Sequence, residues 1–153
     1  MWPHKPAFGW GRTVDQKQSN TAHQLGSRAA RGLWFASARH AELLNEQVNG
    51  PTATEVTVRA IASLVSAGTE MLVYRGELPA EDHLGLETCE GSFGFPVKYA
   101  YQVVGEVIEA GPEAKFKLGQ RVFARHPHED YFNVKSEGWL ISQVPTGPSG
   151  RSS

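Results

Sequence analysis

The chain has 153 residues, of which 40% are hydrophobic and 20% are charged, and its formal net charge is -1 at pH 7. This size fits one globular domain with tails, and the near-zero charge gives no general attraction to nucleic acid or to an acidic membrane. All apolar stretches are much shorter than the ~20 residues that a membrane span needs. The single cysteine, Cys89, excludes an internal disulfide and a multi-cysteine zinc site. We therefore expect a cytoplasmic protein that binds neither nucleic acid nor membrane.

The beginning of the chain is basic and has no periodic apolar pattern. Residues 1–32 hold five Lys and Arg residues against Asp15 as the only acid. Because neither a helical nor an alternating pattern is present, we expect residues 1–30 to be a disordered leader. A transit peptide is the alternative, since the segment is basic and poor in acids. The polar residues 146–153 are expected to form a tail, so the globular domain spans residues 31–145.

Short runs of strand-forming residues dominate the chain between these ends. Glu55–Ile61 alternates polar and apolar side chains, as a half-buried strand does. Further apolar or β-branched runs are also expected to be strands. These are Leu33–Ser37, Gln102–Ile108, Arg121–Ala124, Tyr131–Val134 and Trp139–Val144. Short strands without a long amphipathic helix favour a small β-barrel or sandwich.

One short helix is expected at Thr69–Tyr74. Thr69 can cap its N-terminus, and Glu70 lies favourably near the positive end of the helix dipole. Residues 75–98 follow without clear periodicity and hold several acids and glycines. We expect this segment to form a long excursion across the surface, and such loops are usually functional or disordered.

The order of several short motifs resembles a known superfamily. Residues 66–70 read Ser-Ala-Gly-Thr-Glu, residues 95–99 read Phe-Pro-Val-Lys-Tyr, and residues 121–128 read Arg-Val-Phe-Ala-Arg-His-Pro-His. Together they resemble the N-terminal, substrate-side domain of the medium-chain dehydrogenase/reductase superfamily, to which the zinc-type alcohol dehydrogenases belong. They look most like its zinc-free branch, which includes bacteriochlorophyllide dehydrogenase. The resemblance implies a mainly β fold, namely a small GroES-like β-barrel with one short helix and long loops.

The resemblance also implies that the catalytic zinc site of the superfamily is absent. In zinc-dependent members, the turn and a later Gly-His-Glu segment supply ligands. Matching those motifs places Ala67 at the cysteine ligand position with Gly68 beside it, and places Tyr101 and Gln102 at two further ligand positions. Alanine, a neutral phenol and a primary amide are poor zinc ligands. The chain therefore resembles a zinc-independent member.

Without zinc, hydrogen-bond donors must polarise the oxygen of a substrate. By the resemblance, Thr69 matches the Ser or Thr that relays a proton in relatives, and Tyr101 brings a phenol to a former ligand position. With His128, these residues are the expected catalytic residues. Each also has a purely structural interpretation: Thr69 as a helix cap, Tyr101 as an aromatic strand residue, and His128 as part of a surface loop.

The segment Arg125–Asp130 contains two imidazoles and two carboxylates, which suggests a metal site at first sight. Pro127 keeps the backbone extended and directs His126 and His128 apart, and no third ligand is evident elsewhere, so we expect no metal site here. A histidine facing the substrate is the better interpretation, and the resemblance favours His128. Cys89 has no neighbouring base, so we expect no nucleophilic role for it.

Hydride transfer in this superfamily depends on a nicotinamide held by a Rossmann domain that follows the barrel. The only similar glycine pair, in Gly9-Trp10-Gly11, follows no strand and lacks the third glycine. We therefore expect a truncated substrate-side domain, inactive alone, that uses NAD(P) only with a separate Rossmann half and acts on a small alcohol or carbonyl compound. A non-catalytic small-molecule-binding module and a co-chaperonin-like β-barrel stay open as alternatives.

Overall fold

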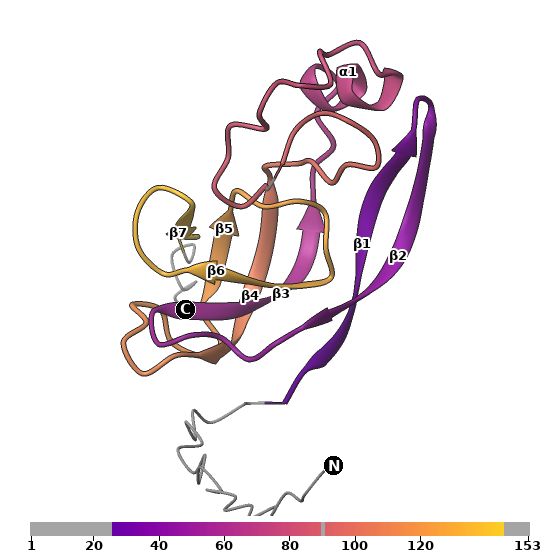
Figure 1. Ribbon diagram of the computed structural model, residues 1–153. Helices are drawn as coiled ribbons and strands as arrows, with labels where there is room; N and C mark the ends of the chain where they lie inside the picture. Colours follow the sequence, from indigo (N-terminus) through magenta and orange to yellow (C-terminus); the bar gives the residue numbers. More distant parts are fainter. Residues whose placement is uncertain (1–25, 90, 146–153) are drawn as a thin grey trace, which may run out of the picture.

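The computed structural model describes residues 26–89 and 91–145, and these residues form a mainly β structure with a single short helix (Figure 1). This agrees with the fold class expected from the sequence. The elements are β1 (Arg28–Ser37), β2 (His40–Val48), β3 (Glu55–Ser63), α1 (Thr69–Arg75), β4 (Val103–Ala110), β5 (Arg121–Ala124), β6 (Tyr131–Lys135) and β7 (Ile141–Gln143). Within this part of the chain, no helix has the length and apolar character needed to cross a bilayer.

The strands form two antiparallel sheets. The larger sheet has the order β6-β3-β4-β5-β7 and is curled, while β1 and β2 form a separate hairpin beside it (Figure 1). Single bridges between Gly32 and Glu129 and between Phe35 and Val97 join the hairpin to the rest of the molecule. At its tip, the N–H of Arg39 donates to the carbonyl of Tyr74 at the end of α1. The hairpin therefore forms one wall of the space beneath α1.

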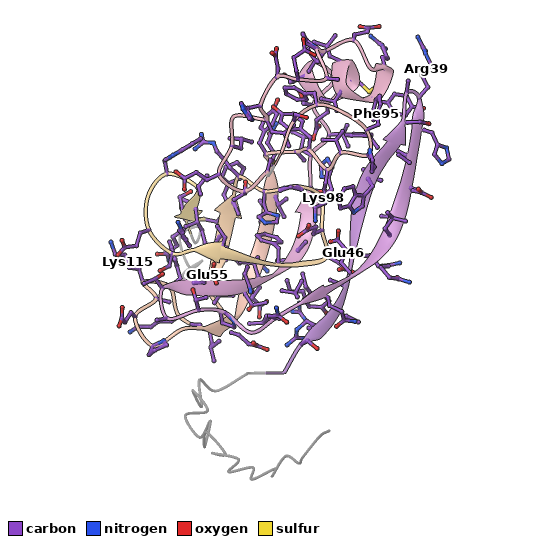
Figure 2. All side chains as sticks on the ribbon, viewed as in Figure 1. Arg39, Glu46, Glu55, Phe95, Lys98 and Lys115 are labelled. Carbon is purple, nitrogen blue, oxygen red and sulfur yellow. The ribbon has the colours of Figure 1, made fainter. Side chains whose placement is uncertain are left out.

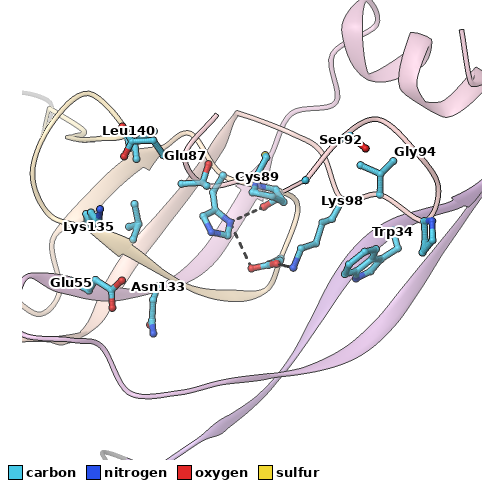
Figure 3. Close-up of a pocket in the computed structure, with 18 residues that line it drawn as sticks. Trp34, Glu55, Glu87, Cys89, Ser92, Gly94, Lys98, Asn133, Lys135 and Leu140 are labelled. Carbon is cyan, nitrogen blue, oxygen red and sulfur yellow. Dashed lines mark hydrogen bonds and ion pairs between the residues drawn. The ribbon is translucent and has the colours of Figure 1, made fainter. Parts of the chain in front are cut away.

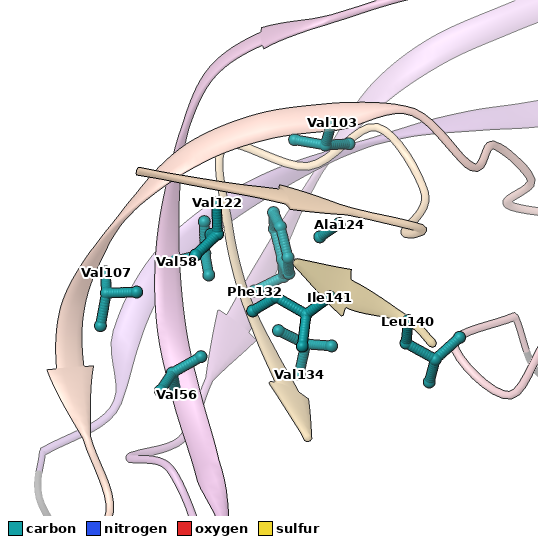
Figure 4. Close-up of a cluster of buried hydrophobic side chains, with 10 residues drawn as sticks. All are labelled: Val56, Val58, Val103, Val107, Val122, Ala124, Phe132, Val134, Leu140 and Ile141. Carbon is teal, nitrogen blue, oxygen red and sulfur yellow. The ribbon is translucent and has the colours of Figure 1, made fainter. Parts of the chain in front are cut away.

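A first core fills the curl of the larger sheet (Figure 4). Alternate residues point inward, so that Val56 and Val58 of β3 meet Val103 and Val107 of β4. Gly105 lies opposite β3 at very close range, because a Cβ atom at this position would stand 2.3 Å from Val58 Cγ1. A glycine is therefore required for the two strands to pack.

A second core lies under the long connection between α1 and β4. Its buried members are Phe35, Val73, Leu84, Cys89, Val97 and Tyr99. The sequence interpretation of residues 75–98 as a surface excursion was therefore wrong in part, because this segment contributes several of these side chains. This connection is neither helix nor strand, so its buried apolar residues do not recur at a regular spacing. Their burial therefore could not be recognised from the sequence.

The hairpin also differs from the prediction. Its second strand, β2, was not predicted, because most of its side chains are exposed on both faces and no alternation marks it. Its first strand begins at Arg28, upstream of the predicted Leu33–Ser37. The expected disordered leader covered residues 1–30, but Arg28–Ala30 belong to β1. Residues 1–25 of that leader and the expected tail at residues 146–153 lie outside the described residues.

Candidate functional site

A cavity of about 260 Å³ lies beneath the start of α1, between the hairpin and the segment that follows β5. Its polar lining groups are Glu70, His128 and the phenol of Tyr74, whose hydroxyl donates to the carbonyl of Arg39. The rest of its wall is aliphatic, aromatic or thioether: Leu33, Phe35, Val65 and Met71. An adjoining hollow of about 410 Å³ shares Leu33, Val65 and His128 with the cavity. A mostly apolar cavity with two convergent polar groups is the usual form of a small-molecule site.

Glu70 is an acidic side chain in an unusually buried position. It lies in the first turn of α1 and is only 1% exposed. Its Oε2 accepts a hydrogen bond from the backbone N–H of Ser66, in the turn before the helix. The sequence correctly indicated an acid at the positive end of the helix, but it did not reveal this burial, because the partner of Glu70 lies far along the chain.

His128 reaches the cavity from the segment between β5 and β6. Backbone hydrogen bonds hold this segment against the hairpin and β3: the N–H of Leu33 donates to the carbonyl of His128 at 2.9 Å, and the N–H of Asp130 donates to the carbonyl of Arg31 at 3.1 Å. The N–H of Ala60 donates to the carbonyl of Asp130 at 2.9 Å. The imidazole is thus carried by a segment that is fixed on both sides.

Glu70 and His128 meet at the cavity. His128 Nε2 lies 2.9 Å from Glu70 Oε1, although the N–H direction is not aligned with the oxygen. Within the described residues, Glu70 Oε1 and both ring nitrogens of His128 therefore lack a hydrogen-bond partner while being fully buried. Each unpaired buried polar group costs about 1–3 kcal/mol, and so it calls for an explanation. A binding or catalytic role is the simplest one.

Thr69 and Tyr101 occupy surroundings that differ from those of the Glu70–His128 pair. Thr69 is the first residue of α1, and the capping position is Gly68, with no side-chain hydrogen bond to the helix end. The interpretation of Thr69 as a helix cap was therefore wrong. Tyr101 is half-buried, and its ring contacts Tyr99 edge-on at 6.0 Å between centroids. No hydrogen bond links Tyr101 to Thr69 or His128 in residues 26–89 and 91–145.

Tyr99 is a buried phenol of the second core that the sequence interpretation did not single out. Burial raises the pKa of Tyr99, and the nearby Cys89, Tyr101 and Glu70 raise this pKa further. The phenol of Tyr99 therefore stays protonated and can act only as a neutral group. Burial also raises the pKa of the Cys89 thiol, so the thiol is protonated near neutral pH.

The residues at the former zinc-ligand positions do not fit a zinc ion. Ala67 is exposed and offers no donor atom, while Tyr101 and Gln102 offer a neutral phenol and an amide. Across the part of the chain that the structure describes, no group of three or more His, Cys, Asp and Glu side chains is arranged to hold a metal ion.

A second polar cluster lies between the hairpin and the barrel, at a hollow of about 660 Å³ (Figure 3). Lys98 Nζ contacts Glu46 of β2 at 3.0 Å and also contacts Glu129, next to His128. Trp34 completes it, since its indole N–H donates to Glu46 at 2.7 Å and Lys98 Nζ lies 5.2 Å from the ring centroid. Figure 2 labels Lys98 and Glu46, which lie next to each other. Because these groups are already paired, we place the candidate site at the smaller cavity.

His126 does not line the cavity beneath α1 and lies instead at the hollow of about 660 Å³. Its ring stacks on Phe132 of β6 at 4.0 Å between centroids, and burial lowers the pKa of His126 to about 3. The 3.6 Å separation between its Nδ1 and Glu129 Oε2 is therefore no ion pair near neutral pH, since the imidazole is uncharged. Pro127 thus stands between one histidine that belongs to the barrel core and another that lines the cavity.

Comparisons with known proteins agree with this architecture. No family model matches the chain. Over 77 residues, or 50% of the chain, it is 35% identical to the 2-desacetyl-2-hydroxyethyl bacteriochlorophyllide A dehydrogenase of Cereibacter sphaeroides, of which the match spans 21%. The quinone oxidoreductase of Coxiella burnetii is similar with a TM-score of 0.56 and 17% identity, over 76% of this chain and 37% of that one. The resemblance to the medium-chain dehydrogenase/reductase superfamily is confirmed.

A third protein extends this comparison. A protein of Sinorhizobium meliloti 1021, described as a zinc-binding dehydrogenase and solved bound to NADP, has a TM-score of 0.56 and 15% identity over 77% of this chain and 39% of that one. The fold of our chain is the GroES-like fold of these enzymes. The chain spans about a fifth of the curated relative and less than half of the solved structures.

Proposed function

We propose that the chain supplies the substrate-side domain of a zinc-independent, NAD(P)-dependent oxidoreductase that interconverts a small alcohol and a carbonyl compound. The observation that carries the proposal is the buried pair of Glu70 and His128 at an apolar cavity, beside a turn whose zinc-ligand position holds Ala67. A fixed imidazole can interact with the oxygen of a substrate where the metal would act in a zinc enzyme.

In this proposal Thr69 and Tyr101 act beside His128. Thr69 begins α1 and directly precedes Glu70 in the chain. Tyr101 belongs to the aromatic group that borders the second core. Both side chains are hydroxyl donors, which is the chemistry that a developing negative charge on a substrate oxygen requires.

The first prediction concerns zinc. Because the matched ligand positions hold Ala67, Tyr101 and Gln102, the purified chain is expected to retain no stoichiometric zinc after dialysis. Elemental analysis measures this directly. Retention of one zinc per chain would contradict the zinc-independent assignment and would require ligands other than those the superfamily uses.

The described residues do not fit a nicotinamide dinucleotide. Their strand pairs are all antiparallel and their one helix has seven residues, whereas the dinucleotide fold needs parallel strands joined through a longer helix. A similar protein was solved bound to NADP. We therefore propose that nucleotide binding requires a Rossmann domain in addition to the residues described.

The experiment combines the 153-residue chain with the nucleotide-binding domain of a similar dehydrogenase. The chain alone is expected to show no NAD(P)H-dependent turnover and no nucleotide binding tighter than about millimolar, whereas the combined protein turns over an alcohol or a carbonyl compound. In the combined protein, Thr69→Ala is expected to lower the rate roughly ten- to a thousandfold, as loss of a proton relay or oxyanion donor does. Thr52→Ala, at an exposed threonine outside the site, is the matched control and should leave the rate unchanged.

The alternatives give different results in the same experiment. Turnover by the chain alone would contradict the need for a second domain. A chain that binds small molecules but never turns over with any Rossmann partner would instead be a non-catalytic binding module. An unaffected Thr69→Ala enzyme would keep the proposed reaction and remove Thr69 from it.

A further inference from the structure

We propose that Glu70 is a positioning residue that holds His128 in one tautomer, so that Nδ1 of His128 accepts a hydrogen bond from the hydroxyl group of a compact apolar alcohol in the cavity. This inference rests on the proposed function in one respect, since it concerns the same site. It adds the group that orients His128, the atom that meets the ligand, and the preference for a hydroxyl over a carbonyl group.

The tautomer follows from the chemistry of the contact. An ionised carboxylate can only accept hydrogen bonds, so the ring nitrogen next to it has to carry the proton. That nitrogen is Nε2, which lies 2.9 Å from Glu70 Oε1. Alignment of this N–H with the oxygen needs a change in the last torsion of the histidine, which is a soft torsion. In a neutral imidazole with Nε2 protonated, Nδ1 carries a lone pair and is an acceptor.

Glu70 is suited to this role because its own position is fixed. Its second oxygen, Oε2, is occupied by the backbone N–H of Ser66, so Oε1 is the oxygen left for His128. The side chain is fully buried at the first turn of α1, and the His128 segment is bound through its backbone to the hairpin. Neither partner can turn to water without moving an element of the fold.

The ligand class follows from the hydrogen-bonding capacity of Nδ1. This nitrogen is buried and has no hydrogen-bond partner among the described residues. Apart from Glu70 and His128, the cavity wall is apolar except for the Tyr74 phenol, whose hydroxyl already donates to the carbonyl of Arg39. An acceptor in such surroundings needs a donor, which a hydroxyl group supplies and a carbonyl group does not. The volume of about 260 Å³ equals roughly nine water volumes, which is enough for one ring with a short substituent.

The tautomer can be tested on the full chain without nucleotide or partner domain. Long-range ¹H–¹⁵N spectra of histidine-labelled protein at pH 7.5 are expected to show His128 with Nε2 protonated and Nδ1 bare, its signals being assigned by their loss in His128→Asn. Glu70→Gln keeps an acceptor for the Ser66 N–H but removes the charge, and it is expected to give a mixture of tautomers. Glu77→Gln, at an exposed glutamate just after α1, should match the wild type.

The ligand is tested with benzyl alcohol and toluene as probes, which differ only in the hydroxyl group. Benzyl alcohol is expected to shift the Nδ1 resonance of His128 and to bind roughly three- to tenfold more tightly than toluene, which is the range of one net hydrogen bond. Glu70→Gln should remove most of this difference, whereas Glu77→Gln should preserve it. Thermal melting of each variant establishes that the fold is intact.

Two results would overturn the inference: a His128 ring with a protonated Nδ1, or equal binding of both probes with an unmoved Nδ1 resonance. Neither readout depends on hydride transfer. If the reconstituted enzyme shows no turnover while the tautomer and the probe preference are as expected, the proposed function fails and the binding site stands. If turnover is present but the probes bind equally, the proposed function stands and this inference fails.

Discussion

Two histidines separated by a single proline in sequence lie in different environments in the structure. His126 is stacked on Phe132 inside the barrel, whereas His128 lines the cavity and contacts Glu70. The sequence predicted that Pro127 would direct the two rings apart, and the structure agrees. The environment of each ring depends on residues that are distant in sequence and are brought together by the fold. Before the structure, only the resemblance to a family indicated which histidine would face the substrate.

The environment of His126 makes stability depend on pH. The pKa of folded His126 lies near 3, below its ordinary value of 6.5, because burial disfavours the charged ring. Between these values the unfolded chain binds a proton that the folded chain does not, so stability is complete above pH 6.5 and falls as the pH drops. For this group alone, the loss between pH 7 and pH 5 is about 2 kcal/mol.

Urea unfolding of wild type and His126→Phe at pH 7, 6 and 5 measures this loss. The variant is expected to lose about 2 kcal/mol less than the wild type over that range. His40→Gln, at an exposed histidine of β2, serves as the control and should behave as the wild type does. Identical pH dependence in His126→Phe and wild type would mean that the pKa of His126 does not change on folding.

Lys98 gives a second prediction at this scale. Its ammonium group lies between Glu46 and Glu129, and the Glu129 side chain is only 5% exposed. Lys98→Met leaves two carboxylates without their counter-ion, and the free energy of unfolding is expected to fall by about 3 kcal/mol. A double-mutant cycle with Glu129→Gln should recover part of this loss, because the buried charge is removed as well.

The control for Lys98 is an exposed pair of the same type. Lys115 and Glu137 are 3.2 Å apart, and both side chains are more than half exposed. Lys115→Met is therefore expected to change stability by less than about 1 kcal/mol. A similar small change for Lys98→Met would show that the cluster does not join the hairpin to the barrel.

At the scale of elements, the strands of the curled sheet were predicted well and the connections poorly. Alternation in Glu55–Ile61 is a local property and was visible in sequence, and that run became part of β3. The strand β2 has no buried face, so it carries no alternation. The pairing of Glu70 with His128 joins a helix to a distant loop, and only the complete fold brings them together.

The second core depends on the contact between the hairpin and the long connection. Phe35 of β1 and Val97 exchange two backbone hydrogen bonds, of 2.8 Å and 3.0 Å, and the Phe35 ring packs edge-on against Tyr74. Phe35→Ala removes a buried ring, which costs about 3–5 kcal/mol in comparable cores. We expect the connection between α1 and β4 to open locally before the curled sheet does.

Limited proteolysis followed by mass spectrometry tests this order. In Phe35→Ala, the first cuts are expected within residues 77–95, with the curled sheet surviving longer. Leu43→Ala, at a side chain of β2 that is 62% exposed, should be cut as slowly as the wild type. First cuts inside the curled sheet of Phe35→Ala would mean that the two cores unfold together.

For the whole molecule, the most distinctive surface feature is an apolar area at the open side of the candidate site. Ile61 and Val65 are each more than half exposed, and together with Leu43 they line the hollow that adjoins the cavity. Ile61 lies at an irregularity of β3, between Ala60 and Ala62, where the register against β4 shifts. Such a bulge re-aims a side chain, here away from the barrel core.

The last prediction tests whether this surface receives the nucleotide-binding domain. If it does, Ile61→Ser and Leu43→Ser should leave the stability of the isolated chain within about 0.5 kcal/mol of wild type, because both side chains are already exposed. In the complex these two side chains would be buried at the interface. Replacing them with serine should therefore weaken the association with a separately supplied Rossmann domain by at least roughly tenfold, which corresponds to about 1.4 kcal/mol. The control for the loss of an exposed apolar side chain is Leu118→Ser, in the loop between β4 and β5, where the side chain is 65% exposed.

Isothermal titration measures the affinity of each variant for the Rossmann domain, and urea unfolding measures its stability. Equal loss of affinity in all three variants would point to a non-specific effect, whereas unchanged affinity in Ile61→Ser and Leu43→Ser would place the docking surface elsewhere on the molecule.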